Sequence, residues 1–429
     1  MNEDTIKGKH AEPAMNTNGN YVQHVFIIGS KSIGQYGGYE TFVDRLIGEH
    51  ENDHRVKYHI ACKANGDGFM DEQKLEKVEV TKRNNDGSTS EFTYKNAHVI
   101  KIHCPEIGSA VAIYYDFIAL KIFIRYCKEN SIKNPIFYIL TCRIGLFIKS
   151  LAKQIHSIGG EYYLNPDGHE WMRTKYSKAV RAYWRWSEEK MVRLSDLVIC
   201  DSVNIEKYIK SEYNHPHTTY IAYGADVAKS RMDDDNQRFV EWLLTRGLEK
   251  EEYYLAVGRF VPENNYETMI REYMACGSKK NFAIITNVNE TFLEELERKL
   301  HWKNDPRIKF VGTVYDKELL KKIREHAYAY FHGHEVGGTN PSLLEAMGST
   351  ELNLLLDVEF NREVGGEAVV YWNKCEGNLS GIIDRVDEMS CELRKEYGLK
   401  AKERIRSKYS WEFIGDEYRK LWMRQSEKE

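Results

Sequence analysis

The sequence predicts an α/β protein built from two doubly wound domains that face each other across a cleft. With 429 residues, the chain is long enough to form two hydrophobic cores of ordinary size. Short apolar runs alternate with longer helical patterns along most of the chain, which is typical of parallel strands joined by right-handed helical crossovers. The alternation breaks near residues 226–235, so we expect one domain on each side of that break.

Buried strands are expected wherever a short apolar run lies between turn residues. In the first domain they are predicted at 25–28, 57–62, 97–102, 136–140, 162–164, 197–200 and 219–222, and in the second at 253–257, 281–286, 308–311, 327–331, 352–356 and 369–371. The stretch 110–127 contains three charged residues, so we expect a buried amphipathic helix there rather than a membrane span. The Asn-, Ser- and Gly-rich stretch 81–93 is expected to be a mobile surface loop.

Composition and charge limit the classes of function. The formal net charge of −4 argues against a general nucleic-acid-binding protein. The eight cysteines occur singly and without zinc-site spacing, which predicts free thiols in a reducing compartment. Residues 1–20 are polar and lack the apolar core of a signal peptide, so we expect a disordered tail on a cytoplasmic protein.

The most informative segment is a glycine-rich loop that enters a helix in the second domain. Gly337 and Gly338 allow main-chain N–H groups to approach a ligand closely. Asn340 is a good N-cap, and Pro341 suits the first helical position. The unpaired N–H groups and the helix dipole favour phosphate there, and Glu345, about one turn inside, can accept hydrogen bonds from sugar hydroxyls. The segment predicts a nucleotide-sugar site; the alternative is an ordinary capped helix with a surface carboxylate.

Three further loops follow predicted strands and are expected to border the cleft. The glycine-rich loop 29–42 suits a diphosphate or an acceptor, unless its glycines serve only chain geometry. Arg259 suits charge-assisted hydrogen bonds to phosphate, each contributing about 1.5–3 kcal/mol, and a solvated ion pair is the alternative. The turn 165–171 gathers two acids and an imidazole that can handle a proton or bind sugar hydroxyls, whereas an Asx-turn closed by Asp167 is the structural alternative.

Residues 171–193 interleave seven basic side chains with five aromatic ones. This pattern suits an anionic membrane surface or a lipid-linked phosphate. A solvated helix with an aromatic core face is the alternative.

On four segments, the chain resembles the family 4 glycosyltransferases of GT-B architecture, which have two Rossmann-like domains. Within that family it is similar to the β-1,4-rhamnosyltransferases that build rhamnose-containing capsule and cell-wall polysaccharides in streptococci and related bacteria. The resemblance runs from Val25 to Leu421 and is most specific at 36–43, 165–171, 257–267 and 332–347.

The resemblance implies a retaining transfer of L-rhamnose from dTDP-β-L-rhamnose to a polyprenyl-diphosphate-linked sugar, either glucose or N-acetylglucosamine, through a β-1,4 linkage. Such enzymes are thought to work by front-side displacement, in which the leaving diphosphate helps to deprotonate the incoming hydroxyl. The protein then contributes positioning and electrostatics. This scheme needs no metal or other cofactor. From the net charge we expect no nucleic-acid partner, and from the pattern of 171–193 we expect peripheral contact with the inner face of the cell membrane.

The resemblance also assigns roles to particular residues. The expected catalytic residues are Asp167, Arg259 and Glu345: Asp167 faces the rhamnose or the acceptor, Arg259 stabilises the diphosphate, and Glu345 holds the ribose. The residues expected to bind the donor are Arg259, Asn264, Gly337, Gly338, Thr339, Asn340 and Glu345. Those expected on the acceptor side of the cleft are Gly37, Gly38, Glu40, His169 and Glu170.

Two positions depart from the broader family pattern. The acidic residue usually found eight positions before Glu345 is a glycine here, and Glu335 lies two residues earlier, so the role of Glu335 is open. Asn264 stands where many relatives carry a phosphate-binding lysine, and Lys31 or Arg271 are the candidates to replace that charge.

The implied architecture divides the chain by role. Residues 21–228 are expected to bind the acceptor, 229–405 to bind the nucleotide sugar, and 406–429 to form a helix that crosses back to the first domain. Three alternatives remain open: a retaining transferase that uses another nucleotide sugar, a GT-B-fold epimerase that converts the donor without an acceptor, and a non-catalytic sugar-nucleotide sensor.

Overall fold

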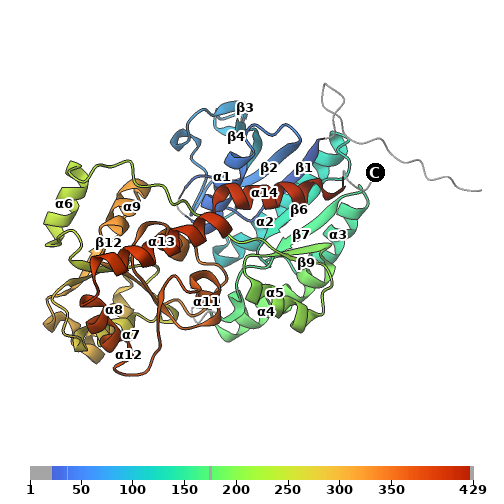
Figure 1. The fold of residues 1–429 in the computed structure, drawn as a ribbon. Coiled ribbons are helices and arrows are strands. Elements are labelled where there is room, and N and C mark those ends of the chain that lie inside the picture. Colours follow the sequence, from blue (N-terminus) through green and yellow to red (C-terminus); the bar gives the residue numbers. More distant parts are fainter. Residues whose placement is uncertain (1–21, 36, 173–175, 426–429) are drawn as a thin grey trace, which may run out of the picture.

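The structure is a computed structural model that describes residues 22–35, 37–172 and 176–425. Figure 1 shows two α/β domains side by side, connected by a linker and by the C-terminal helices. This arrangement confirms the predicted α/β class with two doubly wound domains. The tail predicted over 1–20 lies outside the described residues.

The N-terminal domain is built on one mainly parallel sheet. Its strands are β1 (Gln23–Ile28), β2 (Val56–Lys63), β3 (Glu79–Arg83), β4 (Thr89–Tyr94), β5 (Ala97–Ile102), β6 (Ile136–Leu140), β7 (Glu161–Asn165), β8 (Leu197–Cys200) and β9 (Thr218–Tyr220). They pair in the order β3-β4-β5-β2-β1-β6-β7-β8-β9, and only the two pairs that contain β4 are antiparallel. The strand order reverses between β1 and β6, and ligands bind beyond the carboxyl ends of the strands at such a point.

Helices cover both faces of this sheet. They are α1 (Gly38–Glu49), α2 (Val111–Glu129), α3 (Ile148–His156), α4 (Lys178–Leu194) and α5 (Val203–Tyr213). Successive β1 side chains enter opposite cores: Val25 and Ile27 pack with α1, whereas Phe26 and Ile28 pack with α2 and α3. Helix α2 is the buried amphipathic helix predicted over 110–127.

The prediction that 81–93 forms a mobile loop is wrong. Strands β3 and β4 form a hairpin, and β4 pairs with β5 at the edge of the sheet. The hairpin turns tightly at 84–87, where the N–H of Asn84 donates to the carbonyl of Ser88 at 2.8 Å. Phe92 is fully buried, so a few apolar side chains anchor a segment whose polar composition masked its strand pattern.

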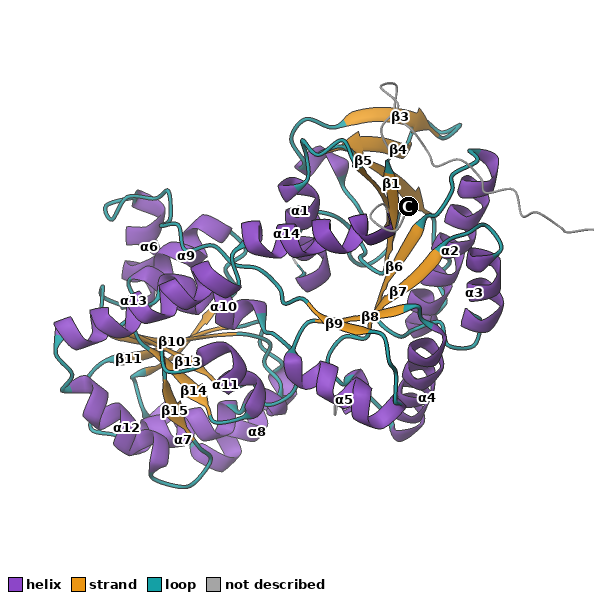
Figure 2. Cartoon of the chain, turned by 45° about the vertical axis from the view of Figure 1, so that its right-hand side comes forward, coloured by secondary structure: helices purple, strands orange, loops and turns teal. Residues whose placement is uncertain are grey.

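The C-terminal domain repeats this design with a fully parallel sheet. Its strands are β10 (Tyr253–Val257), β11 (Asn281–Ile285), β12 (Ile308–Gly312), β13 (Ala329–His332), β14 (Asn353–Leu356) and β15 (Val370–Trp372), in the order β12-β11-β10-β13-β14-β15. Its helices are α6 (Gln237–Arg246), α7 (Tyr266–Ala275), α8 (Glu290–Leu300), α9 (Lys317–Glu325), α10 (Pro341–Ser349), α11 (Glu359–Gly365), α12 (Asn378–Asp387) and α13 (Cys391–Lys408). Helices α7, α8 and α12 share one core and α6, α9 and α10 another, so both faces of the sheet are covered (Figure 2).

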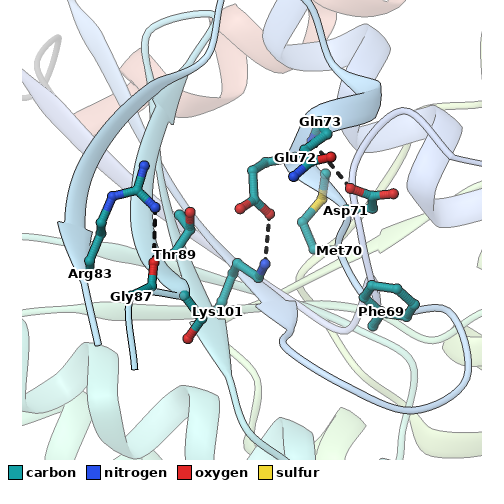
Figure 3. Close-up of a pocket in the computed structure, with 10 residues that line it drawn as sticks. Phe69, Met70, Asp71, Glu72, Gln73, Arg83, Gly87, Thr89 and Lys101 are labelled. Carbon is teal, nitrogen blue, oxygen red and sulfur yellow. Dashed lines mark hydrogen bonds and ion pairs between the residues drawn. The ribbon is translucent and has the colours of Figure 1, made fainter. Parts of the chain in front are cut away.

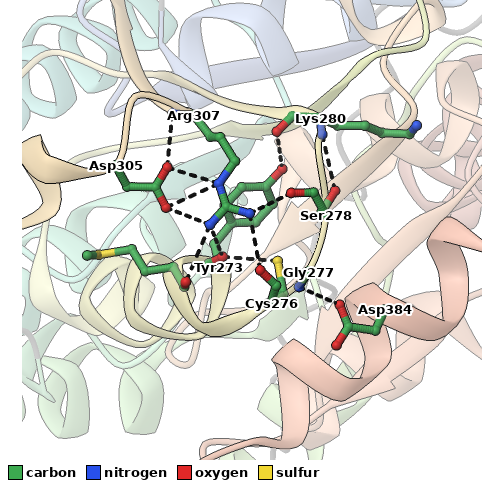
Figure 4. A network of polar contacts seen from close by, with 9 residues as sticks. Tyr273, Cys276, Gly277, Ser278, Lys280, Asp305, Arg307 and Asp384 are labelled. Carbon is green, nitrogen blue, oxygen red and sulfur yellow. Dashed lines mark hydrogen bonds and ion pairs between the residues drawn. The ribbon is translucent and has the colours of Figure 1, made fainter.

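Arg307 lies at the centre of a network of polar contacts at the β12 edge of this sheet (Figure 4). Its guanidinium pairs with Asp305 at 2.6 Å. It also donates to the carbonyl oxygens of Tyr273, Met274, Cys276 and Ser278. Because these carbonyls lie at and just beyond the end of α7, the cation satisfies acceptors that the helix leaves open. Arg307 directly precedes β12, at the amino end of the sheet, so this network stabilises the domain and does not border the cleft.

The last helix, α14 (Trp411–Trp422), packs on the N-terminal domain although it follows the second domain in sequence (Figure 2). The Trp422 indole N–H donates to the Tyr58 hydroxyl at 2.9 Å. The hydroxyls of Tyr138 and Tyr418 lie 2.9 Å apart, and a ring nitrogen of His50 lies 2.8 Å from the Gly415 carbonyl oxygen. The chain therefore crosses between the domains twice.

We expect Trp422→Ala to lower the free energy of unfolding of the N-terminal domain by about 3–5 kcal/mol, because it leaves a large cavity and removes the hydrogen bond from the indole to the Tyr58 hydroxyl. Phe413→Ala on the same helix is the matched control, since that side chain is 42% exposed and its loss should change stability by about 0.5 kcal/mol or less. Urea unfolding followed by circular dichroism measures both, and equal losses would contradict the docking role of Trp422.

Candidate active site

The two domains enclose a cleft of about 510 Å³. The N-terminal domain lines it with His169, Met172, Asn204, Lys207, Tyr208 and Ser211, and the C-terminal domain with Glu335, Val336, Glu359 and Phe360. Loops beyond the carboxyl ends of strands from both sheets meet here, as the sequence predicts for two facing doubly wound domains.

The start of α10 has the geometry of an anion site. The Asn340 side chain caps the helix by accepting from the N–H groups of Ser342 at 2.9 Å and Leu343 at 3.3 Å. Pro341 occupies the first helical position. The N–H groups of Gly338, Thr339 and Asn340 donate no hydrogen bond to any part of the chain that the structure describes. These donors, at the positive end of the helix dipole, are available to a phosphate.

This loop lies directly against the acid turn of the other domain. A Cβ on Gly168 would lie 2.6 Å from the Gly338 nitrogen, and a Cβ on Gly338 would collide with a carboxylate oxygen of Asp201. The Thr339 hydroxyl donates to the Asp201 carbonyl. Only glycine fits at both contact positions, so the glycines allow the two domains to close on each other.

Asp167 lies in this contact and also shapes its own turn. Its N–H donates to the Asn165 side chain at 2.9 Å, and one of its carboxylate oxygens accepts from the Gly168 N–H at 2.8 Å. Asp167 and His169 both have left-handed backbones, with φ of 61° and 46°. Such strained backbones concentrate at functional sites. An Asx-turn is therefore present, but Asn165 closes it rather than Asp167, and Asp167 directly precedes the glycine at the domain contact.

Asp201 is a site residue that sequence reasoning missed. It follows β8, is 3% exposed, and one of its carboxylate oxygens has no hydrogen-bond partner among the described atoms. Burial raises the pKa of Asp201 well above its usual range, and the nearby carboxylates of Asp167 and Glu363 raise it further. Its position immediately after a buried strand is the same signal that singled out the 165–171 turn.

Arg143 was also missed, and it brings a cation to the N-terminal side of the cleft. Its guanidinium donates to the Gly29 carbonyl and pairs with Asp116, both at 3.1 Å. Burial raises the pKa of Asp116 to about 6, although Arg143 opposes that shift. Arg143 also interacts electrostatically with Asp167 and Tyr39, so it lies within reach of the acid turn.

Glu363 of α11, in the C-terminal domain, forms a second contact between the domains. Its carboxylate accepts from the Ser202 hydroxyl at 2.7 Å, the Val203 N–H at 2.8 Å and the Asn204 side chain at 3.0 Å. It thus caps the start of α5 from the other domain. This contact holds Asp201 beside the glycine-rich loop.

The residues expected to hold the donor occupy distinct environments. Arg259 is exposed and forms no ion pair with any described residue. Asn264 is buried, and its side-chain amide donates to the Arg259 carbonyl at 2.8 Å, which closes the loop that contains both residues. The Glu345 side chain is 46% exposed and pairs with the buried Arg324 at 2.6 Å, which fixes its carboxylate near the start of α10. Glu335 pairs with Lys374 at 2.6 Å, at the rim of the cleft.

The two candidates to replace the missing lysine charge already have partners. Lys31 pairs with Asp67 at 2.5 Å, and Arg271 pairs with Glu272 at 3.1 Å. In this arrangement Arg259 is the better-placed cation for a diphosphate, because it has no competing carboxylate among the described residues.

Of the residues predicted on the acceptor side, some stabilise the glycine-rich loop and others line the cleft. Glu40 accepts from the Lys31 N–H at 3.0 Å and lies against Gly37, so it anchors the glycine-rich loop. At Gly38, the first residue of α1, a side chain would meet open space.

His169 lines the cleft, and its ring centroid lies 4.3 Å from that of Tyr208. Burial lowers the pKa of His169, which favours the neutral imidazole at pH 7. Glu170 accepts from the Tyr176 hydroxyl at 2.8 Å, beside the turn that carries His169.

Known structures of the same overall form cover nearly the whole chain. Sucrose-phosphate synthase from Thermosynechococcus elongatus is 15% identical, with a TM-score of 0.71 over 95% of this chain and 100% of that chain. A glycosyltransferase from Rickettsia africae is 9% identical, with a TM-score of 0.67 over 94% and 99%. Anabaena HepE in complex with UDP-glucose is 12% identical, with a TM-score of 0.65 over 94% and 99%. The chain has the GT-B fold.

The GT-B likeness at these identities establishes architecture alone. A family model described as "Domain of unknown function (DUF1972)" matches residues 22–226, which span the N-terminal domain. No curated protein sequence matches the chain.

We expect Asp201→Asn to raise the melting temperature increasingly as the pH rises from 4.5 to 8. The folded-state pKa of Asp201 lies above its unfolded value near 3.9, so ionisation disfavours the folded state above that value, and the amide removes this penalty. Asp233→Asn, at an exposed carboxylate, is the control and should show no such trend. Differential scanning calorimetry at several pH values measures both variants; a gain that shrinks with rising pH would reverse the assignment.

Proposed function

We propose that this protein is a retaining glycosyltransferase that binds a nucleotide sugar at the start of α10 and an acceptor against the N-terminal domain. The observation that carries the proposal is the close contact between Gly338, whose N–H is one of the unpaired donors of 338–340, and Gly168, the residue after Asp167. A diphosphate donor and an acid-bearing acceptor site are thereby brought to one point. The GT-B fold is consistent with this assignment, since a structure of the same fold, Anabaena HepE, holds UDP-glucose.

Within this class, the proposed donor is dTDP-β-L-rhamnose and the proposed acceptor is a polyprenyl-diphosphate-linked glucose or N-acetylglucosamine, joined by a β-1,4 linkage in capsule or cell-wall polysaccharide synthesis. The support is the resemblance of 36–43, 165–171, 257–267 and 332–347 to the rhamnosyltransferase segments. Base and sugar specificity depend on that resemblance.

The proposed reaction is a front-side displacement. The bond between the anomeric carbon and the diphosphate oxygen breaks, the acceptor oxygen bonds to the same face, and the acceptor proton passes to the leaving diphosphate. Arg259 and the N–H groups of 338–340 stabilise the charge that develops on that diphosphate. Glu345 holds the ribose, and Asp167 orients the sugar or the acceptor hydroxyl. Because main-chain donors and a guanidinium supply the electrostatic stabilisation, this scheme requires no metal.

Transfer of labelled rhamnose to synthetic lipid-diphosphate-linked glucose and N-acetylglucosamine tests the function. We expect Arg259→Ala and Asp167→Asn each to lower kcat/KM about 100-fold, since each removes an interaction with the reacting groups. Arg298→Ala, at an exposed arginine on α8, is the matched control and should retain full activity.

Other results of the same assay identify the alternatives. Conversion of the donor without any acceptor indicates an epimerase. If dTDP-rhamnose stays intact and another nucleotide sugar is turned over, the protein is still a glycosyltransferase but its donor is that other nucleotide sugar. Binding of nucleotide sugars without any turnover indicates a sensor.

We further propose that the N-terminal domain contacts an anionic membrane peripherally, on the cytoplasmic side. Among the described residues, no helix is both long and apolar enough to cross a bilayer. Large apolar side chains are exposed at Leu146, Val180 and Trp186. Gly145 donates to the Ser187 hydroxyl at 2.9 Å, which brings the loop that carries Leu146 beside α4. An apolar patch next to basic residues is typical of interfacial binding.

The basic residues of 171–193 contribute unequally to this proposed surface. Arg185 pairs with Glu212 at 2.8 Å and Arg193 with Glu189 at 3.0 Å, whereas Lys178 and Lys190 are exposed. Residues 173–175, which include two of the predicted basic side chains, lie outside the described residues. The lipid contact therefore depends on the exposed apolar side chains as well as on charge.

We expect the double variant Leu146→Glu with Trp186→Glu to bind vesicles of 30% phosphatidylglycerol at least about tenfold more weakly than the unaltered protein, because it replaces inserting apolar groups with anions. Leu399→Glu is the matched control, since Leu399 is 70% exposed on α13 of the other domain. Vesicle co-sedimentation measures binding. Equal binding by all three proteins would exclude this face as the membrane contact.

A further inference from the structure

A second cavity, of about 310 Å³, lies in the N-terminal domain outside the interdomain cleft. It is an open hollow between the β3–β4 hairpin and the loop that follows β2 (Figure 3). Arg83 and Thr89 of the hairpin, Lys101 near the end of β5, and Phe69 and Glu72 of the loop all contribute to its walls. Because β2 and β5 run parallel, their carboxyl ends bring this cavity to the same edge of the sheet as the cleft.

The cavity is physically continuous with the loop proposed to face the acceptor. Met70 lines the cavity, and its sulfur accepts from the Ile33 N–H of the glycine-rich loop at 3.3 Å. At the end of β2, the Lys63 N–H donates to the Lys31 carbonyl of the same glycine-rich loop at 2.7 Å. Hydrogen bonds therefore connect the wall of the cavity to the glycine-rich loop.

The lining combines an aromatic surface with fixed polar groups. Phe69 is 47% exposed in the wall of the cavity, so its ring is accessible to a ligand there. In Figure 3, Phe69 and Arg83 stand on opposite sides of the cavity, with the Lys101–Glu72 ion pair between them at 2.6 Å. Arg83 is held by its hydrogen bond to the Gly87 carbonyl at 3.0 Å and keeps further N–H donors.

The charge of the lining selects among ligand classes. Two cations, Arg83 and Lys101, are balanced by two carboxylates, Asp71 and Glu72. Hydrogen bonds from Lys101 and Thr89 outweigh the effect of burial and lower the pKa of Glu72, so this carboxylate stays ionised at pH 7. A phosphate would meet these anions without a surplus of positive charge, whereas a neutral polyhydroxylated ligand can use both donors and acceptors.

We propose that this cavity is an accessory acceptor subsite that binds a neutral pyranose unit, away from the sugar hydroxyl that is glycosylated. Phe69 provides the apolar face for the ring, and Arg83 and the Lys101–Glu72 pair bind its hydroxyls. The inference rests on the proposed glycosyltransferase function and extends it, because it makes the preferred acceptor an oligosaccharide rather than a single sugar. The β3–β4 hairpin, which forms one wall, then has a role in acceptor choice.

Acceptor length provides the test. Alkyl-diphosphate acceptors that carry glucose or cellobiose, and N-acetylglucosamine or chitobiose, are compared in the full-length enzyme. We expect Phe69→Ala to lower kcat/KM about tenfold for the disaccharide acceptor and less than twofold for the matching monosaccharide. Phe413→Ala, at an equally exposed phenylalanine on α14, should change neither. Equal effects on both acceptor lengths, or no effect, would overturn the subsite.

A binding measurement separates this inference from the transferase activity. Saturation-transfer NMR with methyl β-cellobioside and methyl β-chitobioside requires no donor and no turnover. A signal that is present in the unaltered protein and in Arg259→Ala, but lost in Phe69→Ala and Arg83→Gln, supports the subsite even if no transfer is detected. Absence of any signal from the unaltered protein, or its persistence in both cavity variants, refutes it. Phe69 is half exposed, so its variant should keep the unaltered melting temperature, which confirms folding.

Discussion

The close approach of two glycine-containing loops is the constraint on which the rest of the site depends. Gly168 of one domain lies against the main chain of Gly338 of the other, and Gly338 leaves room for the Asp201 carboxylate. Any side chain at these positions would separate the domains. In the proposed function, this approach brings the donor site at the start of α10 next to the turn that contains Asp167.

Two chain crossings support this approach. The N–H of Ala225 donates to the carbonyl of Tyr409 at 2.7 Å, and Gly224 packs on the ring of Trp411. One apolar cluster continues from α1 and α14 of the first domain to α10 and α13 of the second. The two crossing segments are therefore packed together, and on the opposite side Glu363 joins the domains through its cap on α5.

The electrostatics of the N-terminal side follow from burial. Burial and the nearby charge of Asp167 raise the pKa of Asp201. Arg143 is held by its ion pair with Asp116 and its hydrogen bond to the Gly29 carbonyl. Buried groups whose pKa values are shifted by neighbouring charges are typical of functional sites. The second cavity beside the glycine-rich loop extends the same side of the cleft toward the rest of an acceptor.

The sequence by itself determined the fold class, the parallel strands and the capped start of α10, because apolar periodicity, Asn340 as N-cap and Pro341 after it act locally. It did not reveal the β3–β4 hairpin, whose strands are stabilised by pairing with β5, or the roles of Asp201, Arg143 and Glu363. These depend on contacts between segments far apart in the chain, such as Glu363 on the start of α5. Only the tertiary structure decides such contacts, because burial and charge proximity arise when distant elements pack together.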